Sequence, residues 1–436
     1  MSDVGVDPYT ELTFDAQGDL KPGQREALAR MGATDLLVFA HGWNSDRPVA
    51  NRLYRRFFEP FPRLVADETG VRLGYVGVHW PSMRFADEPI PDFDPPQAIS
   101  PEPTATELDP ATSLALAAFW PEHPQALQRL EELLRTRPDS PLAFEEFGAL
   151  VRQLAAVATP AARAAGNEIA LVAEDVTEAE PLLLTEDTLM VCQLLTEALI
   201  EAGAAPDGAT FSVGGGLRSA WRGAKELLRQ VTYYTMKKRA GVVGERGLGP
   251  ALSQLSQSRP GVRIHLIGHS FGARLVAFAL RGLADSAHGV KSLTLLQGAF
   301  SHYAFARNLP HQRSAAGALC GLQHRVDGPV VCCYSTHDAA LRVFYPLASR
   351  MARDSSGFAG FDARWGAMGH DGILGVDQTL QLDLREALRA GALPPGGCVS
   401  VDASAVVRRG GPPSGAHSDI CHEQLARVVL AAGRIS

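Results

Sequence analysis

A serine placed between two glycines is the feature of this chain best suited to chemistry. The serine is Ser270, in the run Ile-Gly-His-Ser-Phe-Gly-Ala of residues 267–273. The apolar residues before Gly268 predict a strand, and those after Gly272 predict a helix. A sharp turn from strand to helix holds a serine hydroxyl up into solvent on a strained backbone, the arrangement called a nucleophile elbow. An ordinary strand-to-helix turn is the alternative, because the five-residue pattern alone also fits one.

A serine hydroxyl is a weak nucleophile at neutral pH and needs partners. A base, usually histidine, must take its proton, and a carboxylate must orient that base and stabilise its charged form. Two short segments carry both residue types. They are Ser335-Thr336-His337-Asp338 and Gly415-Ala416-His417-Ser418-Asp419.

Alternating apolar runs and helical patterns surround these segments. A short strand is predicted within 9–20, and longer runs of strand length lie at 35–40, 71–80, 262–267, 292–296, 330–334 and 398–407. Helical patterns lie between them, at 23–31, 48–65, 249–258, 275–281, 339–351 and 418–432. Runs that are apolar throughout are typical of strands buried on both faces. The rhythm therefore predicts an α/β fold, with a mostly parallel sheet between two layers of helices.

In four segments the chain resembles the serine hydrolases of the α/β-hydrolase superfamily. They are His41-Gly42-Trp43, Gly268 to Gly272, Ser335 to Asp338 and Gly415 to Asp419. The matching parts lie within 35–82 and 245–436, more than half of the chain. The resemblance implies the α/β-hydrolase fold, a Ser-acid-His triad in that chain order, and cleavage of an acyl ester as in carboxylesterases and lipases. It implies neither a cofactor nor a metal.

The resemblance places the triad acid just after a strand, where Asp338 follows the run 330–334. Aspartate is also a preferred helix N-cap, and Asp338 could cap the helix predicted from Ala339 onward. Both roles can coexist in one side chain. Three other aspartates remain as alternatives, namely Asp362, Asp371 and Asp402.

The base is expected in the loop between the last strand and the final helix, which is the position of His417. His422 lies one turn later and is expected on the helix surface. His370, in Gly369-His370-Asp371-Gly372, is the alternative base because its glycines are typical of a functional loop. His370 precedes the last strand, however, which does not fit the superfamily's order.

Backbone N–H groups are expected to stabilise the oxyanion of the tetrahedral intermediate. One donor is the amide of Phe271, directly after the nucleophile. The other is the amide of Trp43, because His41-Gly42-Trp43 resembles the superfamily's oxyanion loop. Gly42 allows the tight turn there. A strand-end turn with a packed tryptophan is the alternative.

Two parts of the chain differ in character. Residues 9–83 and 245–436 carry the α/β pattern, and 84–244 form an insertion. The insertion opens with a stretch rich in proline and carboxylates, 84–110, which is expected to be mobile. Helices are then predicted at 111–119, 124–136, 141–157, 186–203 and 217–239. We expect the insertion to pack near the mouth of the active site, because loops at the carboxyl ends of strands converge there.

Composition limits the partners and the location. The chain has 436 residues and a net charge of −7, which does not favour nucleic-acid binding. The N-terminus lacks the pattern of a signal peptide, no apolar run is long enough to span a membrane, and the scattered cysteines fit free thiols in the cytoplasm. The expected partner is a small acyl substrate, and the oligomeric state is left open.

Two other classes of function remain at this point. The chain could be an α/β-hydrolase-like binding or scaffold protein whose insertion forms a partner surface. It could also carry out a different reaction on the same fold, such as acyl transfer to another acceptor or thioester cleavage. Intact Ser, Asp and His residues at the expected places favour hydrolysis over the first of these.

Overall fold

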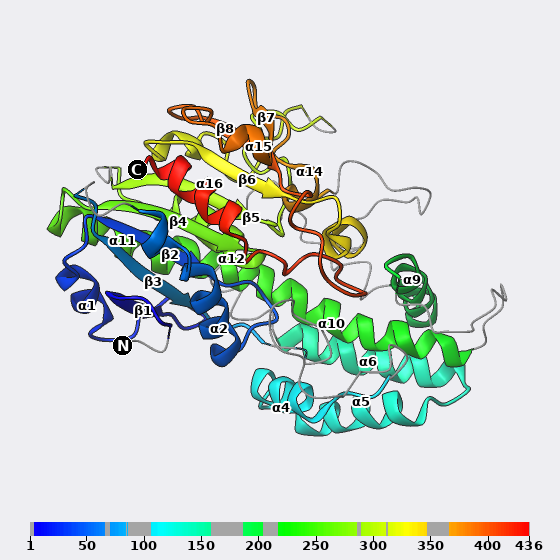
Figure 1. Cartoon of the computed structure of the whole chain (residues 1–436). Helices are drawn as coiled ribbons and strands as arrows, with labels where there is room; N and C mark the ends of the chain where they lie inside the picture. Colours follow the sequence, from blue (N-terminus) through cyan, green and yellow to red (C-terminus); the bar gives the residue numbers. More distant parts are fainter. Residues whose placement is uncertain are drawn as a thin grey trace.

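The computed structural model describes residues 4–65, 70–83, 85, 106–157, 186–203, 217–285, 289–310, 313–346 and 366–435. Within them the chain forms an eight-stranded sheet in the order β1-β3-β2-β4-β5-β6-β8-β7, with helices around it (Figure 1). Every neighbouring pair of strands is parallel. The predicted α/β fold is therefore confirmed, and the sheet is parallel throughout.

The central strands are apolar because both of their faces are covered. All six residues of β2 are buried, as are all but the first of the seven in β4. The strand bounds are β1 Tyr9–Thr13, β2 Asp35–Ala40, β3 Leu73–His79, β4 Arg263–His269, β5 Val290–Leu296, β6 Val330–Tyr334, β7 Leu380–Asp383 and β8 Cys398–Asp402.

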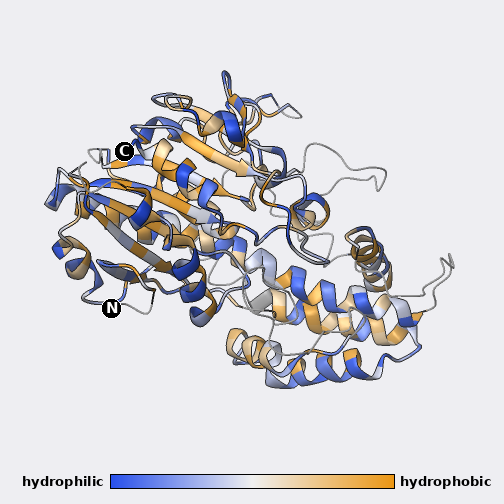
Figure 2. Cartoon of the chain, viewed as in Figure 1, coloured by the Kyte–Doolittle hydropathy of each residue, from blue (hydrophilic) through white to orange (hydrophobic). Residues whose placement is uncertain are grey.

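Two apolar clusters cover the two faces of the sheet. One face packs against α2 (Arg47–Phe58) and α16 (Glu423–Gly433). The other packs against α1 (Gln24–Arg30), α11 (Gly249–Ser258) and α12 (Phe271–Ala279). Figure 2 shows the hydrophobic strands between these amphipathic helices. The sheet is thus the middle layer of three, and its strands all end at the same edge.

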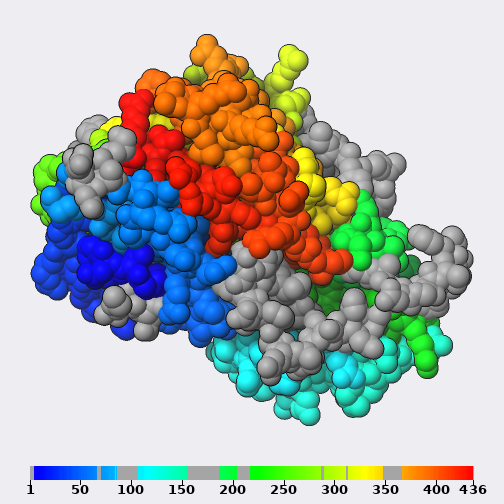
Figure 3. All heavy atoms as spheres, viewed as in Figure 1, coloured from blue at the N-terminus to red at the C-terminus, as the bar shows by residue number. Residues whose placement is uncertain are grey.

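The remaining helices lie mostly in the predicted insertion, where they form a lobe beside the sheet (Figure 3). The cluster that covers α12 continues into this lobe through Trp221, which stacks on Phe144 at a ring-centroid distance of 4.3 Å. The helices there are α4 Pro110–Phe119, α5 Pro124–Thr136, α6 Pro141–Val157, α9 Thr188–Glu201 and α10 Leu217–Val242. The predicted stretch 84–110 lies outside the described residues except for Phe85 and 106–110.

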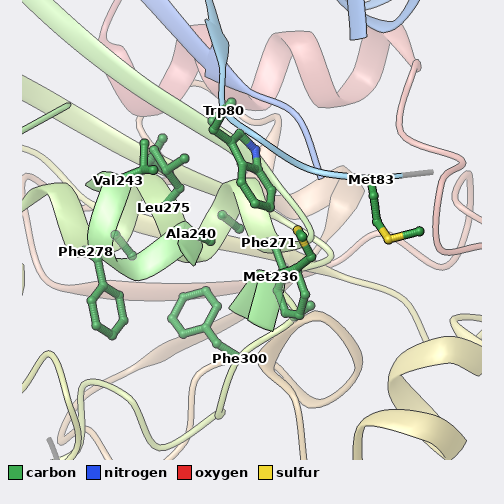
Figure 4. Packing of buried hydrophobic residues seen from close by; sticks show 14 of the residues in the cluster. Trp80, Met83, Met236, Ala240, Val243, Phe271, Leu275, Phe278 and Phe300 are labelled. Carbon is green, nitrogen blue, oxygen red and sulfur yellow. The ribbon is translucent and has the colours of Figure 1, made fainter. Parts of the chain in front are cut away.

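The helix α10 joins the lobe to the sheet layers. It has 26 residues, runs on into the π-helical turn η2 (Val243–Leu248) and α11, and so leads directly to β4. Along this path it packs against α12, the helix that follows Ser270. Phe271 of α12 and Met236 of α10 are buried in the same cluster, drawn in Figure 4. The sequence pattern predicted the end of α10 too early, at residue 239.

Several elements differ from the sequence predictions. The edge strand β7 and the short helices α14 (Met368–Asp371) and α15 (Leu384–Ala387) were not predicted. The last central strand ends at Asp402 rather than 407. The segment after β6 forms a π-helical turn, η4 (Ala340–Phe344), and the rest of the predicted helix beyond 346 lies outside the described residues. Smaller elements are α3 Phe61–Leu64 and the 3-10 turn η3 Leu322–Arg325.

Candidate active site

Ser270 lies on a strained turn between β4 and α12. Its φ of 55° and ψ of −121° are unusual for a residue with a side chain. Glycine is required on both sides of it. A Cβ at Gly272 would lie 2.1 Å from the carbonyl oxygen of Ala40, and one at Gly268 would lie 2.4 Å from that of Gly272. The first contact is with the end of β2 and the second is within the turn itself, so the sharp turn expected between strand and helix is present.

A continuous line of hydrogen bonds joins Ser270 to His417 and Asp338. Ser270 Oγ lies 2.8 Å from His417 Nε2, and His417 Nδ1 lies 2.7 Å from Asp338 Oδ2. A carboxylate only accepts, so Nδ1 carries the proton in this line and Nε2 is free to accept the serine proton. The three side chains come from the ends of β4 and β6 and from the loop after β8. Residues far apart in sequence therefore form one hydrogen-bonded line.

The Ser270 hydroxyl is covered, contrary to the sequence expectation that it would stand in solvent. Ser270 is 4% exposed, and Asp338 is fully buried. The cover comes from two loops. One contains His417, which bonds to the hydroxyl, and the other contains Gly42, where a Cβ would lie 2.8 Å from Ser270 Cβ.

The acid and base loops are joined by their backbones. Asp338 forms an isolated antiparallel bridge with Gly415, and the amide of Ala416 donates to the carbonyl of His337 at 3.0 Å. Asp338 also accepts a hydrogen bond from the amide of Leu341 through Oδ1, at 2.9 Å. One oxygen of Asp338 thus accepts from the turn that follows it, while the other lies against His417. The catalytic role expected for this carboxylate stays a prediction.

A second aspartate, Asp419, fixes the loop that carries His417. Its buried carboxylate accepts from the amides of Arg408 and Arg409 at 2.9 and 2.8 Å, from the Arg409 guanidinium at 2.8 Å, and from His422 Nε2 at 2.9 Å. Burial raises the pKa of Asp419, but the bonds from His422 and the two arginines outweigh it and hold that pKa below its usual range. These hydrogen bonds hold the residues before Glu423 in a loop. The helix α16 therefore begins at Glu423 rather than at the predicted 418.

The predicted oxyanion loop lies directly beside Ser270. The carbonyl of His41 accepts from Trp80 Nε1 at 2.9 Å, and the His41 ring stacks on Trp80, which keeps this turn in place. Burial lowers the pKa of His41 to about 4, so its imidazole is neutral. In the described part of the chain, the amides of Trp43 and Phe271 have no hydrogen-bond partner. Neither N–H group is therefore committed to a hydrogen bond within the described residues.

An aromatic contact ties the helical lobe to this loop. The ring of Tyr233 on α10 lies 4.7 Å from that of Phe271 and 5.5 Å from that of Trp43, between centroids. The rings of Trp43 and Phe271 are 6.2 Å apart. The two residues expected to supply oxyanion donors thus share one neighbour from the lobe. This agrees with the expectation that the insertion packs near the site.

His370, the alternative base, lies in a separate cluster. Its Nδ1 is 2.7 Å from Asp371 Oδ1, and His302 Nδ1 is 2.8 Å from the other oxygen, Asp371 Oδ2. Burial raises the pKa of Asp371, but the bonds from His302 and His370 outweigh this and lower it below its usual range. No hydrogen bond joins His370 to Ser270 among the described residues. His302 has no motif around it that would have predicted this position.

The other alternative residues have different surroundings. Asp402 ends β8 and accepts from the amide of Ser404 at 2.9 Å, and His422 bonds to Asp419 rather than standing free on the helix surface. Asp362 lies outside the described residues.

No protein-family model matches the chain, and the searches of curated proteins and of solved structures found no match. The function must therefore be inferred from the geometry of the site. Among the described residues, no helix is long and apolar enough to cross a membrane, and no group of three or more His, Cys, Asp or Glu could hold a metal ion. The described residues bring together a buried serine, a histidine, an aspartate and two amides that have no hydrogen-bond partner among them.

Proposed function

We propose that this protein is a serine hydrolase of the α/β-hydrolase type, which cleaves an acyl ester through an acyl-enzyme intermediate. The hydrogen-bonded line from Asp338 through His417 to Ser270 carries the proposal. The order Ser, Asp, His along the chain and the strained turn at Ser270 give it further support.

In the first half of the reaction, Ser270 Oγ attacks the carbonyl carbon of the ester. The hydroxyl proton passes to His417 Nε2 over the 2.8 Å hydrogen bond as the new C–O bond forms. His417 becomes an imidazolium, whose Nδ1–H donates to the carboxylate of Asp338 and is stabilised by its negative charge. When the tetrahedral intermediate collapses, the ester C–O bond breaks and His417 returns the proton to the departing alcohol oxygen.

The negative charge on the carbonyl oxygen needs donors during this step. The amides of Phe271 and Trp43 fill this role, because both lack partners among the described residues and both border Ser270. A donor of this kind contributes about 3 kcal/mol to stabilisation of the transition state.

In the second half, a water molecule gives a proton to His417 and attacks the acyl carbon. The bond to Ser270 Oγ then breaks, and the proton on His417 returns to that oxygen, which releases the carboxylic acid. An alcohol or thiol acceptor in place of water would give acyl transfer instead. Product analysis with water and with alcohol acceptors separates these outcomes.

Covalent labelling tests the proposal directly. A fluorophosphonate probe should label the wild-type protein at Ser270, and p-nitrophenyl esters should be hydrolysed. Ser270→Ala should abolish both, by about 10³-fold or more for hydrolysis. Ser258→Ala, a change on α11 away from the site, serves as the matched control and should keep both. A wild-type protein that is neither labelled nor active would favour the binding or scaffold function instead.

A further inference from the structure

His269, the residue just before the nucleophile, contacts all three parts of the site. Its ring nitrogen Nε2 lies 2.8 Å from the backbone carbonyl oxygen of His417. Its other ring nitrogen, Nδ1, faces Gly42, where a Cβ would come within 3.0 Å of it. The side chain therefore lies between the end of β4, the oxyanion loop and the base loop.

The protonation state of His269 follows from these contacts. Burial, followed by the nearby His417, lowers the pKa of His269 to about 3, so the imidazole is neutral at physiological pH. A carbonyl oxygen can only accept, so the single ring proton sits on Nε2 and is donated to His417. Nδ1 then carries no proton, and this unprotonated nitrogen is the one that faces Gly42.

We propose that His269 is a positioning residue, which holds the backbone of His417 so that the catalytic imidazole stays between Asp338 and Ser270. The inference rests on the proposed function, because it assigns His269 a role in that same site. The two rings have centroids 5.1 Å apart, so His269 acts on the base without lying in its proton path. It does not contact Ser270 Oγ through any hydrogen bond among the described residues.

The position of the loop that carries His417 decides whether its ring reaches both Asp338 and Ser270. His417 bonds through Nδ1 and Nε2 to two residues that follow different strands, and both distances are short only when its backbone is fixed. Asp419 and the bridge at Gly415 hold the flanks of the loop. The hydrogen bond from His269 is accepted by the backbone carbonyl of His417 itself. It joins His417 to β4, the strand that directly precedes the nucleophile.

Three substitutions separate the effect of the hydrogen-bond donor of His269 from the effect of the size of its ring. His269→Gln places an amide N–H close to the position of Nε2, His269→Asn places one close to Nδ1, and His269→Phe keeps a ring without a donor. Loss of one buried hydrogen bond that orients a catalytic group should lower kcat about tenfold. We expect this for the Phe and Asn variants, with KM unchanged, and recovery to within about threefold of wild type for the Gln variant.

A readout independent of turnover accompanies the kinetics. The proton between His417 and Asp338 should give a downfield NMR signal that exchanges slowly with water in the wild type and in His269→Gln, and faster in His269→Phe. Thermal melts check that each variant is folded. If the Phe variant keeps wild-type kcat and proton exchange, or if Gln fails as Phe does, the inference is wrong. Lack of fluorophosphonate labelling in wild type would instead refute the proposed function, while the NMR comparison still tests the placement of His417.

Discussion

The two histidine–carboxylate clusters of this protein look alike locally but differ in what surrounds them. In one, His417 donates to Asp338 at 2.7 Å and bonds to Ser270 with its other nitrogen. In the other, His302 and His370 share the carboxylate of Asp371 at 2.8 and 2.7 Å. The buried Nε2 of His302 has no hydrogen-bond partner among the described residues.

Under the proposed function, a histidine held by a carboxylate is not by itself a catalytic base. What distinguishes the first cluster is a hydroxyl at the free nitrogen, and that hydroxyl is there because a strained turn places Ser270 at the end of β4. The second cluster joins the loop at His302 to α14, which gives it a structural role. The predictions below test this contrast.

The largest contrast should come from removing each histidine. His417→Ala should lower ester hydrolysis by about 10³-fold or more, because Ser270 then has no base. His370→Ala should leave kcat within about threefold of wild type, because His370 contributes only to a packed cluster. Steady-state kinetics on p-nitrophenyl esters measure both. A large loss with His370→Ala and a small one with His417→Ala would reverse the roles of the two clusters.

A matched pair of glycine substitutions should separate activity from stability. A Cβ at Gly42 would lie 2.8 Å from Ser270 Cβ, and one at Gly366 would lie 2.0 Å from Asp371 Oδ2. Overpacking of this kind costs about 1–3 kcal/mol of unfolding free energy at either site. Gly42→Ala should also reduce kcat at least about tenfold by displacing Ser270, because misplacement of a reacting group is costly.

Gly366→Ala, in contrast, should lower the melting temperature while the folded enzyme keeps its kcat. Urea unfolding and kinetics on the same preparations check the pair. An equal loss of kcat in both variants would mean that the second cluster also supports the reaction.

The smallest effect per residue concerns pH and the buried histidines around the first cluster. Burial is the main cause that lowers the pKa values of His269 and His79 to about 3 and of His41 to about 4, from an ordinary 6.5. Below pH 6.5 the unfolded chain takes up protons that the folded chain does not, so the unfolding free energy falls as pH drops. Between pH 7 and 5 each histidine should account for about 1–2 kcal/mol.

The carboxylate of Asp371 in the second cluster should not contribute in that range. The pKa of Asp371 is lowered below its ordinary 3.8, so the stability it adds is present above that pH and is lost only in stronger acid. Urea unfolding at several pH values measures the slope. His269→Gln should flatten it, and an unchanged slope would mean that His269 is not buried in its neutral form.

Much of the fold could be predicted because the information is local: apolar runs mark the central strands. Ser270 and Asp338 each follow such a run closely, and His417 lies in the loop between β8 and α16. The edge strand β7 was missed because its residues are mostly exposed, so it has no apolar pattern. The domain bounds and the catalytic roles of Ser270, Asp338, His417, Trp43 and Phe271 stay predictions.

What sequence could not give depends on contacts between distant segments. The bond from His269 to the His417 carbonyl, the four donors around Asp419, and the pairing of His302 with Asp371 have no local pattern. Polar side chains of this kind acquire their partners only when the loops after different strands meet. The covered state of Ser270 has the same origin, because the loops that cover it come from elsewhere in the chain.

The order of the strands has a consequence for how the chain is made. β2 pairs with β4, and Asp35 lies opposite Arg263, so the helical lobe lies between these partners in sequence. A ribosome therefore releases β2, β3 and the lobe before the strand that carries Ser270. Until β4 arrives, one edge of β2 lacks its neighbour, and such an edge can pair with other chains. Pairing across so long a loop is also intrinsically slow. The strands that follow β4 then extend the sheet, and the segments after β6 and β8 bring Asp338 and His417 to Ser270. A chain interrupted before β4 therefore has neither the full sheet nor this set of side chains.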